Sequence, residues 1–128
     1  MRANELRIWN YVRFYATESI ITAINNNDEE NSYVDVASYN DIPIEDLNPI
    51  PLTEEWLVKF GFIKIKYLNE YFVQEIGYKF NDMILRYGSF DGHRFYFDFA
   101  NEKVINVKHV NQLQNLYFAL TGEELTIK

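Results

Sequence analysis

Cysteine is absent from the 128 residues of this sequence, which excludes disulfide frameworks and metal sites built on thiolates. Long hydrophobic runs are also absent, and the segment from Met1 to Tyr15 lacks the apolar stretch of a signal peptide. We therefore expect a cytoplasmic protein without a membrane partner.

Basic residues are scarce, because 12 lysines and arginines stand against 19 aspartates and glutamates and leave a net charge of −7. Sequence-independent binding to nucleic acid depends on cations that neutralise phosphates. The charge balance therefore argues against a nucleic-acid partner.

Sequence motifs for catalysis are missing as well. The 5 glycines form no phosphate-binding loop, and no serine lies in a nucleophile-elbow sequence. The two histidines, His93 and His109, lack the spacing of metal ligands. We expect no catalytic residue, no metal and no cofactor, and hence a non-enzymatic protein. The alternative is a small enzyme that uses His109 with a neighbouring carboxylate, because histidine exchanges protons near neutral pH.

Apolar residues make up 48% of the sequence, with 10 tyrosines and 10 phenylalanines, so the chain is expected to fold. Its length fits a single domain over residues 1–128. Residues 6–15 alternate with the period of a strand, and residues 20–24 and 33–39 continue in the same style around a polar loop. This pattern predicts an N-terminal β-subdomain, residues 1–50, with a small curled antiparallel sheet such as an SH3-like barrel.

Residues 51–128 are expected to form a short helix, a β-meander and a C-terminal helix. Thr53 is a good N-cap residue, and Gly61 can adopt the left-handed conformation that ends a helix. Strand-like segments follow up to Val107, with a hairpin turn at Asp91-Gly92. Residues 68–76 fit either a strand or one or two helical turns, and we assign them as strand.

A C-terminal helix is predicted from His109 to Thr121, with Gly122 as its cap. Its apolar residues recur at spacings of three and four and are expected to face the core: Val110, Leu113, Leu116, Tyr117 and Leu120. We expect this helix to cover the meander, which gives an α+β fold.

The other side of this helix has no charged side chain, since no Asp, Glu, Lys or Arg occurs from His109 to Thr121. It is expected to face protein and to form an interface, with homo-oligomer formation as the favoured case: Asn111, Gln112, Asn115 and Phe118. Amide side chains both donate and accept hydrogen bonds. The same residues could therefore cap loops of their own chain or bind a small ligand.

A second candidate surface lies on the first predicted strand, where cations and aromatic rings alternate: Arg7, Trp9, Tyr11, Arg13 and Tyr15. Such a face can stack nucleotides, because every base offers a π-face and arginine adds charge. The alternative is an ordinary outer sheet face on which arginine stems cover the rings.

Residues 111–125, residues 49–57 and the opening Glu5-Leu6-Arg7-Ile8 resemble a family of small uncharacterised proteins from phages and mobile elements of gut Bacteroidetes. The carrying motifs are PIPLTEEWL and QLQNLYFALTGEEL. Roughly a third of the chain carries the resemblance. Two positions depart from the family pattern, with Trp9 where glycine is usual and Asn111 where histidine is usual. The resemblance implies a phage-type origin and the host cytoplasm, and it implies no activity.

These observations favour a phage-type accessory protein that binds or interacts with a partner, as a homo-oligomer, without catalysis. One alternative is a counter-defence protein that sequesters a nucleotide signal or another small ligand.

Overall fold

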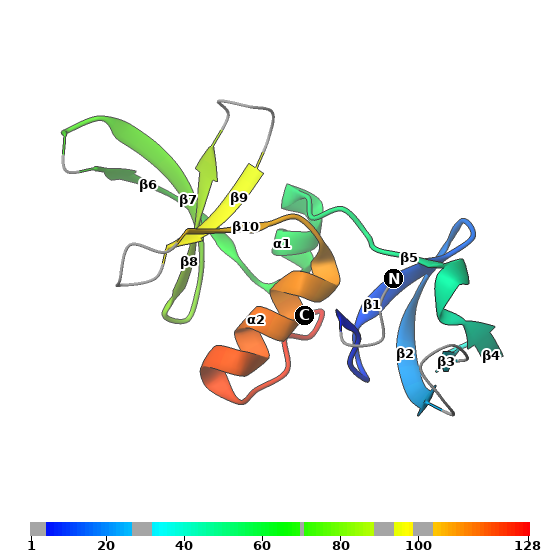
Figure 1. The fold of residues 1–128 in the computed structure, drawn as a ribbon. Helices are drawn as coiled ribbons and strands as arrows, with labels where there is room; N and C mark the ends of the chain where they lie inside the picture. The colour runs from blue at the N-terminus through cyan, green and yellow to red at the C-terminus, as the bar shows by residue number, and fades with distance from the viewer. Residues whose placement is uncertain (1–4, 27–31, 70, 89–93, 99–103) are drawn as a thin grey trace. The chain divides into compact units, whose positions relative to one another are not determined.

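The structure is a computed structural model that describes the chain except for residues 1–4, 27–31, 70, 89–93 and 99–103 (Figure 1). The chain forms two compact units. The first contains Met1–Pro51 and His109–Glu124, and the second contains Leu52–Lys108 and Leu125–Lys128. The C-terminal helix therefore belongs to the first unit.

The first unit contains a five-stranded antiparallel sheet with the strand order β4-β3-β2-β1-β5. Its strands are β1 (Tyr11–Phe14), β2 (Thr17–Asn26), β3 (Ser32–Val36), β4 (Tyr39–Pro43) and β5 (Leu47–Asn48). A 3-10 turn, Ile44–Asp46, separates β4 from β5. The sheet curls into a half-barrel, which confirms the predicted small curled sheet.

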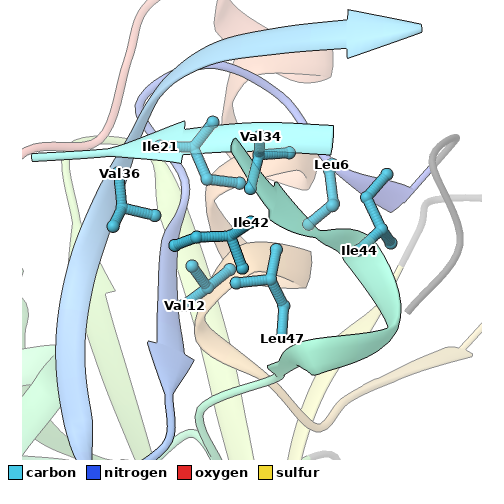
Figure 2. Close-up of a cluster of buried hydrophobic side chains, with 8 residues drawn as sticks. All are labelled: Leu6, Val12, Ile21, Val34, Val36, Ile42, Ile44 and Leu47. Carbon is cyan, nitrogen blue, oxygen red and sulfur yellow. The ribbon is translucent and has the colours of Figure 1, made fainter. Parts of the chain in front are cut away.

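One cluster of buried aliphatic side chains fills the inside of this curl (Figure 2). Its members are Leu6, Val12, Ile21, Val34, Val36, Ile42, Ile44 and Leu47. They come from all five strands, from the 3-10 turn and from the segment before β1. Burial of their apolar surface is the main force that closes the sheet.

The predicted strand over residues 6–15 is wrong in its first half, because β1 begins only at Tyr11. Before it, Asn10 accepts a hydrogen bond from the Arg7 amide at 2.7 Å through its side chain. Its own amide donates to the Arg7 carbonyl at 3.1 Å. A buried asparagine thus holds a turn in place of a strand. The predicted strand over residues 33–39 is likewise divided between β3 and β4.

The second unit contains α1 (Glu54–Phe60) and a meander with the strand order β10-β9-β8-β7-β6. Thr53 accepts from the Trp56 amide at 3.4 Å, and Gly61 ends the helix at φ 96°, so both predicted helix ends are confirmed. The strands are β6 (Ile63–Leu68), β7 (Gln74–Phe80), β8 (Met83–Gly88), β9 (Arg94–Asp98) and β10 (Val104–Val107).

The strand predicted over residues 68–76 is interrupted by the turn of a hairpin. Leu68 pairs with Gln74, and the residues between them reverse the chain. The predicted turn at Asp91-Gly92 lies outside the described residues.

Helix α2 (Val110–Thr121) begins one residue later than predicted, with His109 as its N-cap, and it ends at Gly122 with φ 75°, as predicted. Val110, Leu113 and Tyr117 are buried. Leu120 was expected in the core and is 48% exposed, because the whole last turn of the helix, residues 118–121, is exposed. No helix in the described part of the chain has the length and hydrophobicity needed to span a membrane.

Candidate functional site

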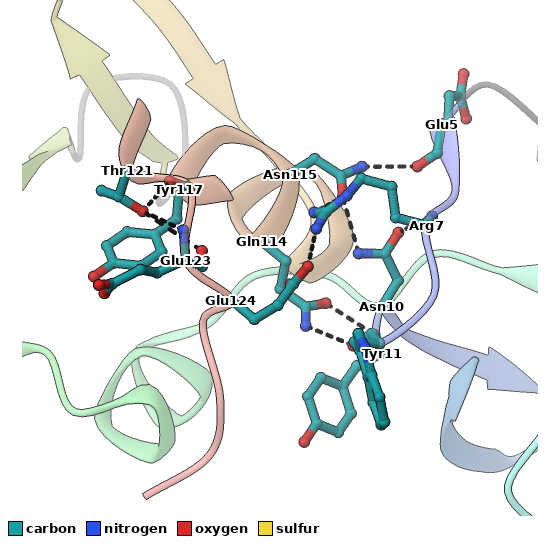
Figure 3. Close-up of polar contacts among 11 residues, drawn as sticks. Glu5, Arg7, Asn10, Tyr11, Gln114, Asn115, Tyr117, Thr121, Glu123 and Glu124 are labelled. Atoms are coloured by element: carbon teal, nitrogen blue, oxygen red, sulfur yellow. Dashed lines mark hydrogen bonds and ion pairs between the residues drawn. The ribbon is translucent and has the colours of Figure 1, made fainter. Parts of the chain in front are cut away.

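Helix α2 is joined to the segment before β1 by side-chain amides (Figure 3). The fully buried side chain of Gln114 accepts from the Tyr11 amide at 2.9 Å and donates to the Trp9 carbonyl at 2.9 Å. A glutamine thereby pairs with the backbone as a neighbouring strand would. We call this group the amide junction: Arg7, Asn10, Gln114, Asn115 and Glu124.

Asn115 is the centre of the amide junction. Its Oδ1 accepts from Asn10 Nδ2 and from Arg7 Nη1, both at 2.9 Å, and its Nδ2 donates to the Glu5 carbonyl at 2.9 Å. Arg7 also forms an ion pair with Glu124, and its guanidinium carbon lies 4.0 Å from the centre of the Phe118 ring. Asn115 and Phe118, predicted at an interface, therefore contact their own chain.

The five residues of the predicted stacking face do not lie along one strand. Arg7 belongs to the amide junction, and Arg13 pairs with Glu18 across the β1–β2 hairpin at 3.4 Å. Trp9 and Tyr15 have positive φ values of 80° and 54°, which turn the backbone out of the strand geometry. The region of φ at Trp9 is one that glycine favours. The alternating pattern of the sequence predicted the strand correctly only from Tyr11 onward.

A cavity of about 360 Å³ lies at the start of α2. Its lining is Glu5, Pro49, His109, Asn111, Gln112 and Asn115. Three of the four predicted interface residues, Asn111, Gln112 and Asn115, thus line one cavity together with His109 and Glu5. Asn111 Nδ2 donates to the Glu5 carbonyl at 3.3 Å, whereas Asn111 Oδ1 is buried without a hydrogen-bond partner. The other histidine, His93, lies outside the described residues.

The turn between β6 and β7 exposes large apolar side chains that sequence reasoning missed. Phe72 is 84% exposed and Tyr71 is 76% exposed, with Leu68 and Val73 exposed beside them. We call residues 68–69 and 71–73 the hairpin tip. The sequence signal was an asparagine, a turn-forming residue, followed closely by three apolar residues.

Asn69 fixes the backbone of the hairpin tip. Its side-chain Oδ1 accepts from the backbone amides of Tyr71 at 2.8 Å and Val73 at 3.0 Å. Its backbone amide donates to the Val73 carbonyl at 3.0 Å. Its Nδ2 donates to Glu75 Oε1 at 2.9 Å. Phe72 is held at φ 59°, a left-handed conformation that phenylalanine rarely adopts.

Glu75 links this turn to the sheet, because its second oxygen accepts from the Tyr67 hydroxyl at 3.0 Å. Burial of the Tyr67 ring, together with this hydrogen bond and the Glu75 charge, raises the pKa of Tyr67 to about 12. Nearby, Arg86 pairs with Asp98 through two hydrogen bonds of 3.0 and 3.2 Å. This pairing raises the pKa of Arg86 further above its usual value.

Within the described ranges, no group of three or more histidine, aspartate or glutamate side chains could hold a metal ion. No protein family, curated protein or solved structure matches this chain.

Proposed function

We propose that this protein is a non-enzymatic interaction module that docks onto a protein partner through the hairpin tip. The observation that carries the proposal is the position of Phe72, an apolar ring placed almost wholly in solvent on a hydrogen-bonded turn. A full burial of a phenylalanine side chain is worth roughly 1.5 to 3 kcal/mol, which the isolated chain forgoes at this position.

The conformation of the turn supports the same function. A non-glycine residue at positive φ costs about 1 to 2 kcal/mol, and such outliers persist where the surrounding structure fixes them. Asn69 supplies that constraint, because its Oδ1 accepts from the amides of Tyr71 and Val73 and its backbone amide donates to the Val73 carbonyl. A pre-organised turn loses little conformational entropy on binding, so its exposed rings can contribute most of their burial energy to affinity.

The partner that fits the hairpin tip is a protein with an apolar cleft edged by lysine or arginine. From Tyr67 to Tyr78 the sequence contains two glutamates and no lysine or arginine. An anionic lipid surface attracts basic segments, so this composition disfavours a membrane. A basic rim on a protein partner would be attracted to these glutamates and would orient the encounter.

Other features agree with a binding role. The strand order β4-β3-β2-β1-β5, with a 3-10 turn between β4 and β5, is consistent with an SH3-like barrel. The resemblance to phage proteins would place the partner in the host cytoplasm. A second copy of the chain is the alternative partner, which would make the protein a homo-oligomer. Nucleotide sequestration on the Arg7–Tyr15 face is less favoured, since those residues do not share a surface strand.

A photo-crosslinking amino acid at position 72 tests this proposal, with position 39 as the matched control. Tyr39 is also an exposed aromatic residue on a hairpin, in the other unit. A protein captured from the host extract at position 72 and not at position 39 would be purified, and its affinity for the wild-type chain measured. We expect Phe72→Ser to weaken that affinity by about thirtyfold, as for a central aromatic anchor, and Tyr39→Ser to leave it unchanged.

Four results would contradict the proposal. Equal capture at both positions, or unchanged affinity of Phe72→Ser, would remove the hairpin tip as the docking element. Phe72-dependent binding to anionic vesicles would instead indicate a membrane. A particle mass that rises with protein concentration, and falls in Phe72→Ser, would show that the tip binds another copy.

A further inference from the structure

Strand β6 forms one edge of the meander. In the strand order β10-β9-β8-β7-β6 it pairs with β7 alone, over the described residues of the sheet. Its side chains are largely exposed, with Ile63 at 68% and Leu68 at 63%. An edge strand of this kind can accept a further strand, because its outward amides and carbonyls are free to form hydrogen bonds.

The turn after β6 shows which of its residues direct their backbone groups away from β7. The Asn69 amide donates to the Val73 carbonyl, so these two residues form a hydrogen-bonded pair of the antiparallel ladder. Such pairs recur at every second residue, so the odd-numbered residues of β6 bond to β7 and the even-numbered ones point outward. The outward groups are therefore the amides and carbonyls of Lys64 and Lys66. Within the described part of the chain no other segment pairs with them.

The other sheet edges are less suited to strand addition. β10 has four residues and β5 has two. β4 contains Asp41 at φ 55° and ends in Pro43, and its pairing with β3 is irregular. β6 pairs with β7 in one continuous register over six residues, without a bulge or a proline. Among the described strands, β6 is therefore the longest and most regular edge.

The side chains of β6 differ in character between the two faces of the strand. Ile63 and Ile65 lie on one face, where they line a cavity of about 450 Å³. Lys64 and Lys66 lie on the opposite face, because successive side chains of a strand alternate. The Lys64 ammonium is 3.9 Å from a carboxylate oxygen of Glu54, and both side chains are about half exposed. Such a surface pair contributes little to stability and opens readily.

This alternation defines the strand that the edge fits. Neighbours on adjacent strands stabilise each other through opposite charges or through apolar contact. We propose that β6 binds an extended segment of a protein partner in which acidic residues alternate with apolar ones. The acidic residues lie opposite Lys64 and Lys66, and the apolar residues lie beside Ile63 and Ile65. A second copy of β6 does not fit, because antiparallel pairing about Ile65 would set Lys64 against Lys66.

This site goes beyond the function proposed for the hairpin tip and does not rest on it. The hairpin tip offers exposed side chains, whereas β6 offers backbone groups and two lysines. Phe72→Ser removes the anchor of the hairpin tip and should leave binding at β6 unchanged. Failure of either proposal therefore leaves the other standing.

A synthetic peptide with blocked ends and the sequence TVEVEVT is the probe for this site. Titration of the wild-type protein, followed by amide chemical shifts in two-dimensional NMR, reports the position and the affinity of binding. We expect the largest shifts at the amides of Lys64 and Lys66.

Two N-methylated forms of the peptide test the backbone pairing. The glutamates of the peptide lie opposite the outward residues of β6, so their own N–H groups face the edge. N-methylation of both glutamates should weaken binding at least about tenfold, whereas N-methylation of two valines should leave it unchanged. Equal effects of the two forms would overturn the proposal.

Charge reversal on the protein gives an independent check. The double variant Lys64→Glu, Lys66→Glu should bind TVEVEVT at least about tenfold more weakly and should prefer the peptide TVKVKVT. Both lysines are exposed, so the variant is expected to fold. Lys79→Glu, the same change at an exposed position of β7, is the control and should keep the preference of the wild-type chain.

The remaining outcomes also decide. Absence of shifts at Lys64 and Lys66 up to the solubility of the acidic peptide, or equal affinity of the wild-type chain for the acidic and basic peptides, overturns the proposal. Loss of peptide binding in Phe72→Ser would assign the peptide to the hairpin tip and would overturn it as well.

Discussion

At the residue scale, amide side chains perform backbone-like pairing in this protein. The Gln114 side chain accepts a hydrogen bond from the Tyr11 amide and donates one to the Trp9 carbonyl. Asn115 Oδ1 accepts hydrogen bonds from both Asn10 Nδ2 and Arg7 Nη1. Burial explains the absence of charge at Asn111 and Gln114, because an amide can be satisfied in the interior whereas an ionised group would lose its hydration.

The first prediction concerns Gln114. Gln114→Ala removes the hydrogen bonds of this side chain to the Tyr11 amide and the Trp9 carbonyl, and it opens a cavity beside β1. We expect the free energy of unfolding to fall by roughly 2 to 4 kcal/mol. Urea denaturation followed by circular dichroism measures this change. Gln74→Ala, at an exposed position, should change it by less than about 0.5 kcal/mol, and equal effects would refute the role given to Gln114.

The second prediction concerns Tyr67 in alkaline solution. Its pKa is raised from 10.0 to about 12, so the folded state holds the hydroxyl proton more tightly than the unfolded chain does. The stabilisation is therefore complete below about pH 10 and is lost as the pH rises through about 12. Titration of tyrosinate absorbance, compared between the wild-type chain and Tyr67→Phe, isolates this group. Glu75→Gln should lower the pKa of Tyr67, because the acceptor charge is gone, while the burial effect remains.

At the element scale, helix ends and tight turns fix the path of the chain. Thr53 and Gly61 confine α1 to seven residues, and Gly122 ends α2. The hairpin tip depends in the same way on Asn69, whose side chain replaces backbone partners within the turn. Local chemistry at a few positions therefore decides where each element stops.

The third prediction compares two glycines that end helices. Gly122 has φ 75° with open space where a side chain would lie, so Gly122→Ala should cost only the left-handed strain of about 1 kcal/mol. Gly61 has φ 96°, and an added Cβ would lie 3.1 Å from Lys128 Cγ and 3.3 Å from the Phe80 ring. Gly61→Ala should therefore lower the free energy of unfolding by about 1 kcal/mol more than Gly122→Ala. Equal losses in thermal denaturation would contradict this ranking.

At the scale of the whole molecule, the chain interleaves its two units. It leaves the first unit after Pro51, builds the meander, and returns at His109 to supply the helix that completes the first unit. The last residues, Leu125–Lys128, belong to the second unit again, where the Lys128 amide donates to the Lys59 carbonyl at 2.8 Å. Neither unit is a continuous stretch of sequence.

The fourth prediction follows from this interleaving. Units of this size have marginal cores when they stand alone, so we expect the chain to unfold as one cooperative domain. Native-state hydrogen exchange should give the same free energy of opening for the Leu113 amide in α2 and the Leu85 amide in β8. A difference of more than about 1 kcal/mol between them would show that the two units unfold separately.

The sequence by itself determined the local features of this protein. Capping residues marked both helices, alternation marked the meander, and β-branched and aromatic residues marked the curled sheet, because these signals act between residues that are close along the chain. The alternating pattern predicted strand wrongly where an asparagine side chain bonds to the backbone and holds a turn. This happens at Asn10 before β1 and at Asn69 in the hairpin tip.

Tertiary structure alone decided which distant residues meet. The partners of Gln114 lie more than 100 positions away, and the wall of the cavity at the start of α2 joins Glu5 to His109. Tertiary structure also left the rings of the hairpin tip in solvent, although their composition is that of core residues. Spacing along a chain records the period of one element, whereas burial and long-range hydrogen bonds depend on how the elements pack.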